Sequence, residues 1–158
     1  MPERLLAHDF RITPDYGGFD LYDGDCDARD PEVATRARSE VAAGTGYEIA
    51  IACAGTMDVD LTIEAWNAAP DSDLTSWEGH RLLALECPTG TLVISKRTIG
   101  ATVLELPGPG NYAVRVMYQG WQQMNEAMSV FPISAERAQI LTGERFVVQF
   151  WPSSQQYN

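Results

Sequence analysis

The stretch "YEIAIACAGTMDVDLTIEAW" (residues 47–66) indicates the fold class, because it holds two strand-like runs separated by a short turn. In the second run, every second residue from position 59 is apolar. These residues are Val59, Leu61, Ile63 and Ala65. Such alternation is typical of a strand with one face in the core and the other in water. We expect residues 47–55 and 57–66 to form a pair of neighbouring strands.

The same pattern continues on both sides of this pair. Further strand-like runs lie at 4–12, 19–22, 81–87, 91–95, 101–106, 111–119 and 144–152. Turn-forming residues separate these runs at the spacing typical of sandwiches and barrels, and the turn "TPDYGG" should pair 4–12 with 19–22. We therefore expect one all-β domain over residues 1–152, followed by a frayed tail at 153–158. Its fold should be an antiparallel, jelly-roll-like β-sandwich of about eight to nine strands with one or two short helices.

Two segments carry helix signals. The first begins with Asp30, a favourable N-cap, has Pro31 at the first helical position and ends at Gly44. The second covers 133–143, with a serine near its start and a glycine at its end. The residues around Trp121 are expected to form a loop.

Composition limits the classes of protein to consider. A chain of 158 residues can bury one substantial core, and no apolar run approaches the ~18 residues of a membrane span. The first residues lack the pattern of a secretory signal, so we expect a cytoplasmic protein. Three cysteines without CxxC spacing predict neither a disulfide framework nor a zinc site, and no cofactor is expected. Cys53 and Cys87 should lie in the core, and Cys26 in a loop.

The charge is unevenly distributed along the chain. The net charge is −11, and residues 1–75 hold 16 acids against 5 arginines, whereas the remaining residues balance. An acidic surface repels phosphate backbones, which argues against direct binding of nucleic acid, and it attracts basic partners. Solubility alone would also explain the charge. The oligomeric state is left open.

The densest acidic segment is "LYDGDCDARDPE" (residues 21–32). Its aspartates match the first positions of an EF-hand loop, but Ala28 and Ala34 replace the glycine and the bidentate glutamate that this loop needs. Three hypotheses remain for the segment: a solvated loop, a calcium site and a surface for a basic protein. The calcium site would combine Asp23, Asp25, Asp27, Asp71 and Asp73. The partner surface would comprise Asp20, Asp23, Asp25, Asp27, Asp30, Glu32 and Trp121.

Catalytic motifs are scarce. His8 and His80 are the only histidines, no serine or cysteine lies in a nucleophile motif, and a three-histidine metal centre is excluded. Trp121 lies among polar amides and could stack on a sugar, which makes a carbohydrate-binding module an alternative. An enzyme with an unrecognised site is a second alternative.

One stretch supports a family resemblance. Residues 95–118 contain, in this order, Ser95-Lys96-Arg97, the strand "ATVLEL", Pro107, Gly110, Tyr112 and the strand "AVRVM". This order resembles the competence protein J family, small bacterial inhibitors of a DNA-entry nuclease. "GNYAVRV" with the late "FVVQFWP" is similar as well to uncharacterised bacterial β-sandwich proteins.

The resemblance implies a binding protein without catalysis, cytoplasmic or facing the periplasm. Its acidic first half would mask the basic cleft of a nuclease. No inhibitory residue is carried over from the family. Our leading hypothesis is a non-enzymatic interaction domain, of nuclease-inhibitor or immunity type, that binds a basic partner through its acidic loop.

Overall fold

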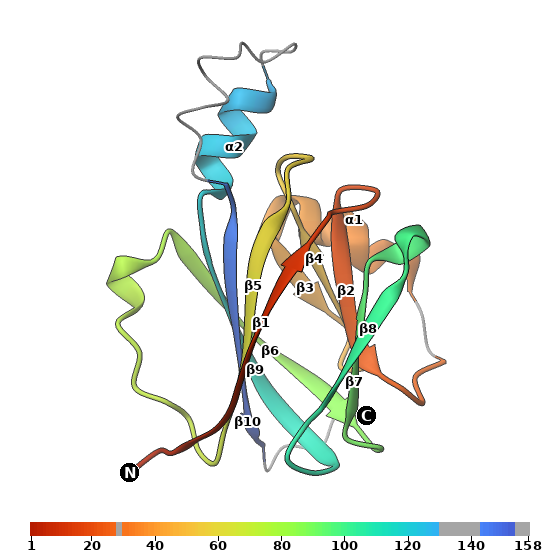
Figure 1. The fold of residues 1–158 in the computed structure, drawn as a ribbon, viewed down its shortest axis with the longest axis vertical. Coiled ribbons are helices and arrows are strands. Elements are labelled where there is room, and N and C mark those ends of the chain that lie inside the picture. The colour runs from red at the N-terminus through yellow and green to blue at the C-terminus, as the bar shows by residue number, and fades with distance from the viewer. Residues whose placement is uncertain (28–29, 130–142, 154–158) are drawn as a thin grey trace.

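The chain forms two stacked five-stranded sheets (Figure 1). The computed structural model describes residues 1–27, 30–129 and 143–153. The strand order in sheet A is β1 (Arg4–Ile12), β5 (Val59–Trp66), β10 (Arg145–Pro152), β9 (Gly110–Gln119) and β6 (Gly79–Cys87). The order in sheet B is β3 (Ala42–Gly44), β4 (Glu48–Ala52), β2 (Gly18–Asp23), β7 (Thr91–Ser95) and β8 (Ala101–Glu105). The prediction of a β-sandwich is confirmed.

The core lies between the two sheets and draws apolar residues from both. Phe19 of sheet B meets Phe146 of sheet A edge to face, with ring centroids 5.8 Å apart. The alternating apolar residues of β5 are fully buried, as the sequence predicts. Cys53 and Cys87 are also buried, which confirms their expected place in the core.

The two expected pairings of neighbouring strands are wrong. β4 belongs to sheet B and β5 to sheet A, so the segment between them crosses from one sheet to the other. β1 pairs with β5, and β2 pairs with β4 and β7, so "TPDYGG" is likewise a crossing rather than a simple hairpin turn. Alternation within a strand shows which residues face the core, but both strands of such a crossing can face the same core from opposite sides.

The sandwich also departs from the expected strand count and direction. The described residues form ten strands, because the segment 42–44, expected to belong to a helix, forms β3 instead. The helix ends earlier, at Glu40, since Val41 adopts a φ of 71° that an α-helix cannot include. β10 runs parallel to β5, whereas the other neighbouring pairs among the described strands are antiparallel.

Helix α1 (Pro31–Glu40) covers part of the outer face of sheet B. The Asp30 carboxylate accepts a hydrogen bond from the Glu32 backbone N–H at 2.9 Å, so the predicted start of the helix is confirmed. Val33 and Ala37 pack on the alanines of β3 and β4. β4 is consequently buried at all five positions, because α1 covers the face that the core does not.

Helix α2 (Trp121–Met128) replaces the loop expected around Trp121 and rises from one end of the sandwich (Figure 1). The Glu78 carboxylate caps it by accepting from the backbone N–H groups of Trp121 and Gln122, each at 3.0 Å. Two short 3-10 helices, η1 (Leu74–Ser76) and η2 (Arg97–Ile99), complete the described elements. None of the described helices is long and apolar enough to cross a membrane. Residues 133–142 of the helix expected at 133–143 lie outside the described residues, as do residues 154–158 of the expected tail.

Candidate functional site

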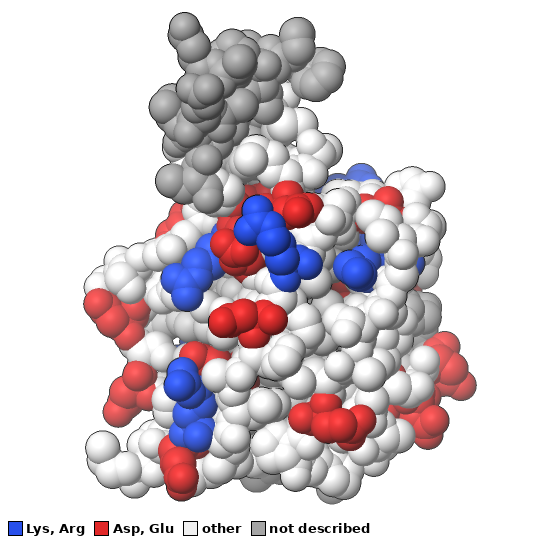
Figure 2. Space-filling model, in the orientation of Figure 1, with Lys and Arg blue, Asp and Glu red and all other residues white. Residues whose placement is uncertain are grey.

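An acidic pocket of about 410 Å³ lies where the loop after β2 meets the start of β4 and the end of β6. Its described lining residues are Asp23, Asp25, Cys26, Asp27, Tyr47, Glu86 and Pro88. None of them is a lysine or an arginine. Figure 2 shows carboxylates at the lower right of the view, over the loop that follows β2 in Figure 1. The pocket is therefore a local concentration of negative charge.

Hydrogen bonds to backbone carbonyls hold the segments of this acidic pocket together. Gly24 N–H donates to the Thr91 carbonyl at 2.9 Å, which fixes the loop beside β7. Glu86 N–H donates to the Gly46 carbonyl at 2.8 Å, which ties β6 to the turn between β3 and β4. The Cys26 thiol donates to the Tyr47 carbonyl at 3.3 Å. The pocket wall is thus built from residues that are far apart in sequence.

Asp23 supports the acidic pocket from within. It is 1% exposed, and its carboxylate accepts from Asp25 N–H at 2.9 Å and from the Thr89 hydroxyl at 2.8 Å. Asp25 and Asp27 are exposed instead, and Glu86 is half-buried. The carboxylates that a partner can reach are therefore those of Asp25, Asp27 and Glu86.

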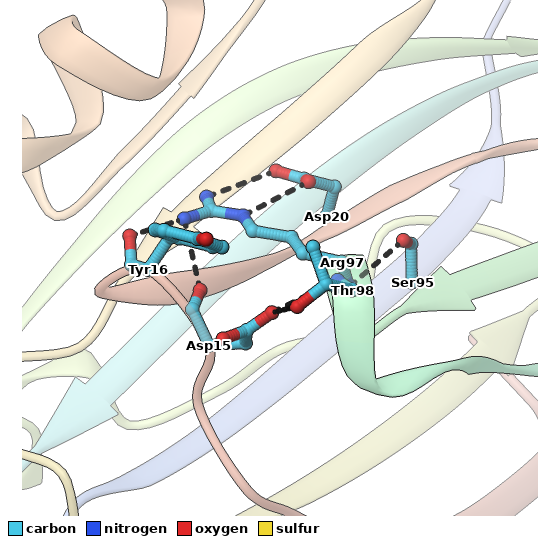
Figure 3. A network of polar contacts seen from close by, with 6 residues as sticks. All are labelled: Asp15, Tyr16, Asp20, Ser95, Arg97 and Thr98. Carbon is cyan, nitrogen blue, oxygen red and sulfur yellow. Dashed lines mark hydrogen bonds and ion pairs between the residues drawn. The ribbon is translucent and has the colours of Figure 1, made fainter.

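Asp20 forms an ion pair with Arg97, as Figure 3 shows. The guanidinium donates from Nε and Nη2 to the two Asp20 carboxylate oxygens, at 3.1 and 3.2 Å. Its Nη1 donates to the backbone carbonyls of Asp15 and Tyr16, at 3.2 and 2.6 Å. Asp20 is only 4% exposed. This part of the predicted partner surface is a buried ion pair that joins β2 to η2.

Ser95-Lys96-Arg97, where the family resemblance begins, makes further hydrogen bonds beside this ion pair. Arg97 adopts a φ of 58°, and its N–H donates to the Ser95 hydroxyl at 3.1 Å. The Asp15 carboxylate accepts from Thr98 N–H at 2.8 Å and also from the Thr98 hydroxyl. Ser95-Lys96-Arg97 therefore links the β1–β2 connection to the β7–β8 connection.

The remaining residues of the predicted surface lie elsewhere. Asp30 caps α1, and Glu32 is exposed in its first turn. Trp121 is half-buried, and its indole N–H donates to the Ala52 carbonyl at 3.2 Å. It lines a separate pocket of about 230 Å³, together with Arg38 and Asn125. The structure does not place Trp121 among the residues of the acidic pocket.

The calcium hypothesis gains no support from the geometry. Asp73 lies in the connection between β5 and β6, where its carboxylate accepts from the hydroxyl and the N–H of Thr75 and so caps η1. These hydrogen bonds, the hydroxyl first, lower the pKa of Asp73. Asp71 is exposed in the same connection. Across the described ranges, no three His, Cys, Asp or Glu side chains form a group that could hold a metal ion.

The two histidines of the chain lie away from the acidic pocket. His8 lies on β1 and His80 on β6, at opposite edges of sheet A, and neither lines the pocket. Burial, followed by the charges of Asp23 and Glu86, raises the pKa of the Cys87 thiol to about 12. A thiol with this pKa stays protonated and is a poor nucleophile.

Four lining residues of the acidic pocket lie outside the predicted partner surface: Cys26, Tyr47, Glu86 and Pro88. Tyr47 and Glu86 belong to strand-like runs or their edges, where an exposed polar residue is ordinary. Only the meeting of β6 with the β3–β4 turn brings them to the acidic loop. The turn signal of "CPTG" after Glu86 is the one local hint that Pro88 lies at an end of the sandwich.

Comparison with known proteins finds the fold but no family. No protein-family model matches the chain, and no curated protein matches its sequence. The crystal structure of ComJ from Bacillus subtilis, described as an inhibitor of the DNA-degrading activity of NucA, is similar, with a TM-score of 0.62 and 12% sequence identity. The structure described as crocagin biosynthetic gene J is also similar, with a TM-score of 0.55 and 15% identity. Each comparison covers 97% of this chain and 99% of the other. The expected resemblance to the competence protein J family is confirmed at the level of the fold.

Proposed function

We propose that this protein is a non-enzymatic, cytoplasmic inhibitor that binds a basic nuclease through the acidic pocket. The observation that carries the proposal is the pocket itself, in which Asp25, Asp27 and Glu86 present carboxylates and no described lining residue is basic. A nuclease needs lysines and arginines to hold the phosphate backbone of its substrate. An acidic pocket of this size can receive such a side chain and keep it from DNA.

Two further features support a nuclease as the partner. The likeness to ComJ extends over nearly the whole of both chains, and ComJ is described as an inhibitor of a DNA-degrading nuclease. The net charge of −11 would accelerate the encounter with a basic protein, because complementary charges steer association. The same charge disfavours direct binding of the protein to DNA.

A nuclease assay tests this proposal. The nuclease most similar to NucA in the same organism would digest labelled DNA in the presence of increasing amounts of wild type or of the variant Asp25→Asn/Asp27→Asn. We expect this variant to inhibit about tenfold less well, a loss of about 1.4 kcal/mol. The matched control is Glu40→Gln/Asp71→Asn, which removes two exposed charges outside the acidic pocket and should change inhibition less than about twofold. Equal inhibition by the two double variants would exclude the pocket as the binding site.

Salt provides an independent prediction. Inhibition by wild type should weaken steeply between about 50 and 200 mM salt, because charges separated by more than about 8 to 10 Å are screened in this range. The variant Asp25→Asn/Asp27→Asn should show a shallower dependence. An inhibition constant that does not change with salt would contradict binding through charge.

A further inference from the structure

Among the described elements, a helix covers only one half of the outer face of sheet B. Helix α1 packs on β3 and β4, and no described helix packs on the half formed by β2, β7 and β8. On this half, the strand register aligns Tyr22 with Val93 and Val93 with Val103. Val103 is 60% exposed, and Tyr22 and Val93 are half-buried. We call the row of these three residues the apolar strip.

The outer face of sheet A provides a comparison, because its corresponding row is mainly polar and its polar side chains are hydrogen-bonded. The corresponding row contains Leu82, Arg115, Gln149 and Glu64. Gln149 donates to Glu64 at 2.9 Å, and Arg115 donates to Gln149 and to the Pro70 carbonyl, each at 3.3 Å. Leu82 is 65% exposed at the end of this polar row. Leu82 is thus a single exposed residue beside satisfied polar groups. Val103 is instead the exposed end of a row that continues through the half-buried Val93 and Tyr22, and contiguous apolar surface is typical of an interaction surface.

The apolar strip is continuous with the acidic pocket. The next outward-facing row toward the pocket contains Thr91, whose hydroxyl donates to the Glu105 carboxylate at 2.8 Å. Gly24, in the loop that forms the pocket, donates its N–H to the Thr91 carbonyl. Glu105, on the strand that carries Val103, is exposed. A partner bound at the acidic pocket would therefore reach Val103 by crossing the row that contains Thr91 and the Glu105 carboxylate.

We propose that the apolar strip is the second part of the nuclease contact and takes an apolar side chain that neighbours the basic residues of the nuclease. This inference rests on the proposed function. A second copy of this chain fits the strip poorly, since both molecules carry a net charge of −11 and acids line its margin. In this arrangement the acids of the pocket determine how fast the partner arrives, and the buried apolar area determines how slowly it leaves.

The test measures association and dissociation rates of the nuclease on the immobilised protein. Val103→Ser is expected to raise the dissociation rate about tenfold and to leave the association rate unchanged. Asp25→Asn/Asp27→Asn is expected to lower the association rate. The control is Leu82→Ser, an equivalent change at a similarly exposed leucine, which should alter neither rate. Val103→Thr, which keeps the β-branched shape that suits a strand, should show the same direction of change if Val103→Ser folds poorly.

Three outcomes separate the possibilities. The first outcome is that the nuclease dissociates from Val103→Ser at the wild-type rate but associates more slowly with Asp25→Asn/Asp27→Asn. This result would overturn the role of the apolar strip in binding and leave the proposed function intact. A nuclease that does not bind wild type would overturn both. A wild type that sediments as a dimer, with Val103→Ser as a monomer, would assign the strip to self-association and overturn this inference.

Discussion

Arg97 is the clearest single residue on which stability depends. Its side chain is only 16% exposed, and its guanidinium donates to both oxygens of the buried Asp20 carboxylate and to two backbone carbonyls. Removing one partner of a buried ion pair leaves the other charge without compensation. We expect Arg97→Ala to lower the free energy of unfolding by about 3 kcal/mol, measured by urea denaturation.

An exposed ion pair provides the matched control for this prediction. Arg11 is 68% exposed and pairs with Asp58 and Asp60 on the outside of sheet A. Arg11→Ala should cost less than about 1 kcal/mol, because water and salt screen exposed pairs. If Arg97→Ala lowers the free energy of unfolding no more than Arg11→Ala does, the Asp20–Arg97 ion pair contributes no more to stability than an exposed ion pair.

Glu144 should make stability depend on pH. It is 2% exposed and accepts from the backbone N–H groups of Ala54 and Gly55, at 2.7 and 3.2 Å. Burial raises its pKa from 4.5 to about 7, although the two N–H groups oppose the shift and the charge of Glu78 adds to it. The folded protein therefore binds a proton more tightly than the unfolded chain does. This contribution to stability is complete below about pH 4.5 and is lost as the pH rises to about 7.

The variant Glu144→Gln isolates this effect. Its side chain stays neutral, so the difference in unfolding free energy between wild type and variant should fall with rising pH, by on the order of 2 kcal/mol between about pH 5 and 8. Urea denaturation at several pH values measures this difference. A difference that stays constant with pH would show that the Glu144 carboxyl has the same pKa in both states.

At the scale of single residues, the sequence predicts the acidic loop but not how its acids are used. Asp25 and Asp27 line the acidic pocket as charge density alone would suggest. Asp20 and Asp23 look the same in sequence, yet buried contacts with Arg97 and Thr89 engage them. These contacts join residues more than sixty positions apart, so no local pattern could have distinguished the four aspartates.

At the scale of elements, strands are easier to predict than their partners. Alternation correctly located β5, and the apolar run 144–152 correctly located β10. The same alternation could not show that β4 and β5 belong to different sheets, since both contribute apolar residues to one core. α2 was missed because its cap is the distant Glu78 carboxylate rather than a local residue.

The cap of α1 allows structure and charge to be separated at Asp30. Asp30→Ala removes the hydrogen bond to Glu32 N–H and should lower the free energy of unfolding by about 1 kcal/mol. Asp30→Asn keeps an acceptor oxygen and should preserve most of the stability while removing the charge. Thermal unfolding measures both variants. If Asp30→Asn loses as much stability as Asp30→Ala, the charge at the helix start matters more than the hydrogen bond.

At the scale of the whole molecule, salt should act oppositely on stability and on binding. A net charge of −11 repels itself within the compact fold. Raising the salt from about 10 to 150 mM shortens the screening length from about 30 to 8 Å. We expect the melting temperature of the isolated protein to rise over this range, in a scanning calorimeter, while inhibition weakens. A melting temperature that falls with salt would indicate that surface ion pairs outweigh the repulsion.

The position of β10 has a consequence for the order in which the fold is completed. β10 is the middle strand of sheet A and comes after the other four strands of that sheet in sequence, so β1 and β5 cannot join β9 and β6 in one sheet without it. Until residues 145–152 take their place, sheet A exists at most as two separate pairs of strands beside an open core. A chain that lacks this one segment should therefore fail to form a complete sandwich.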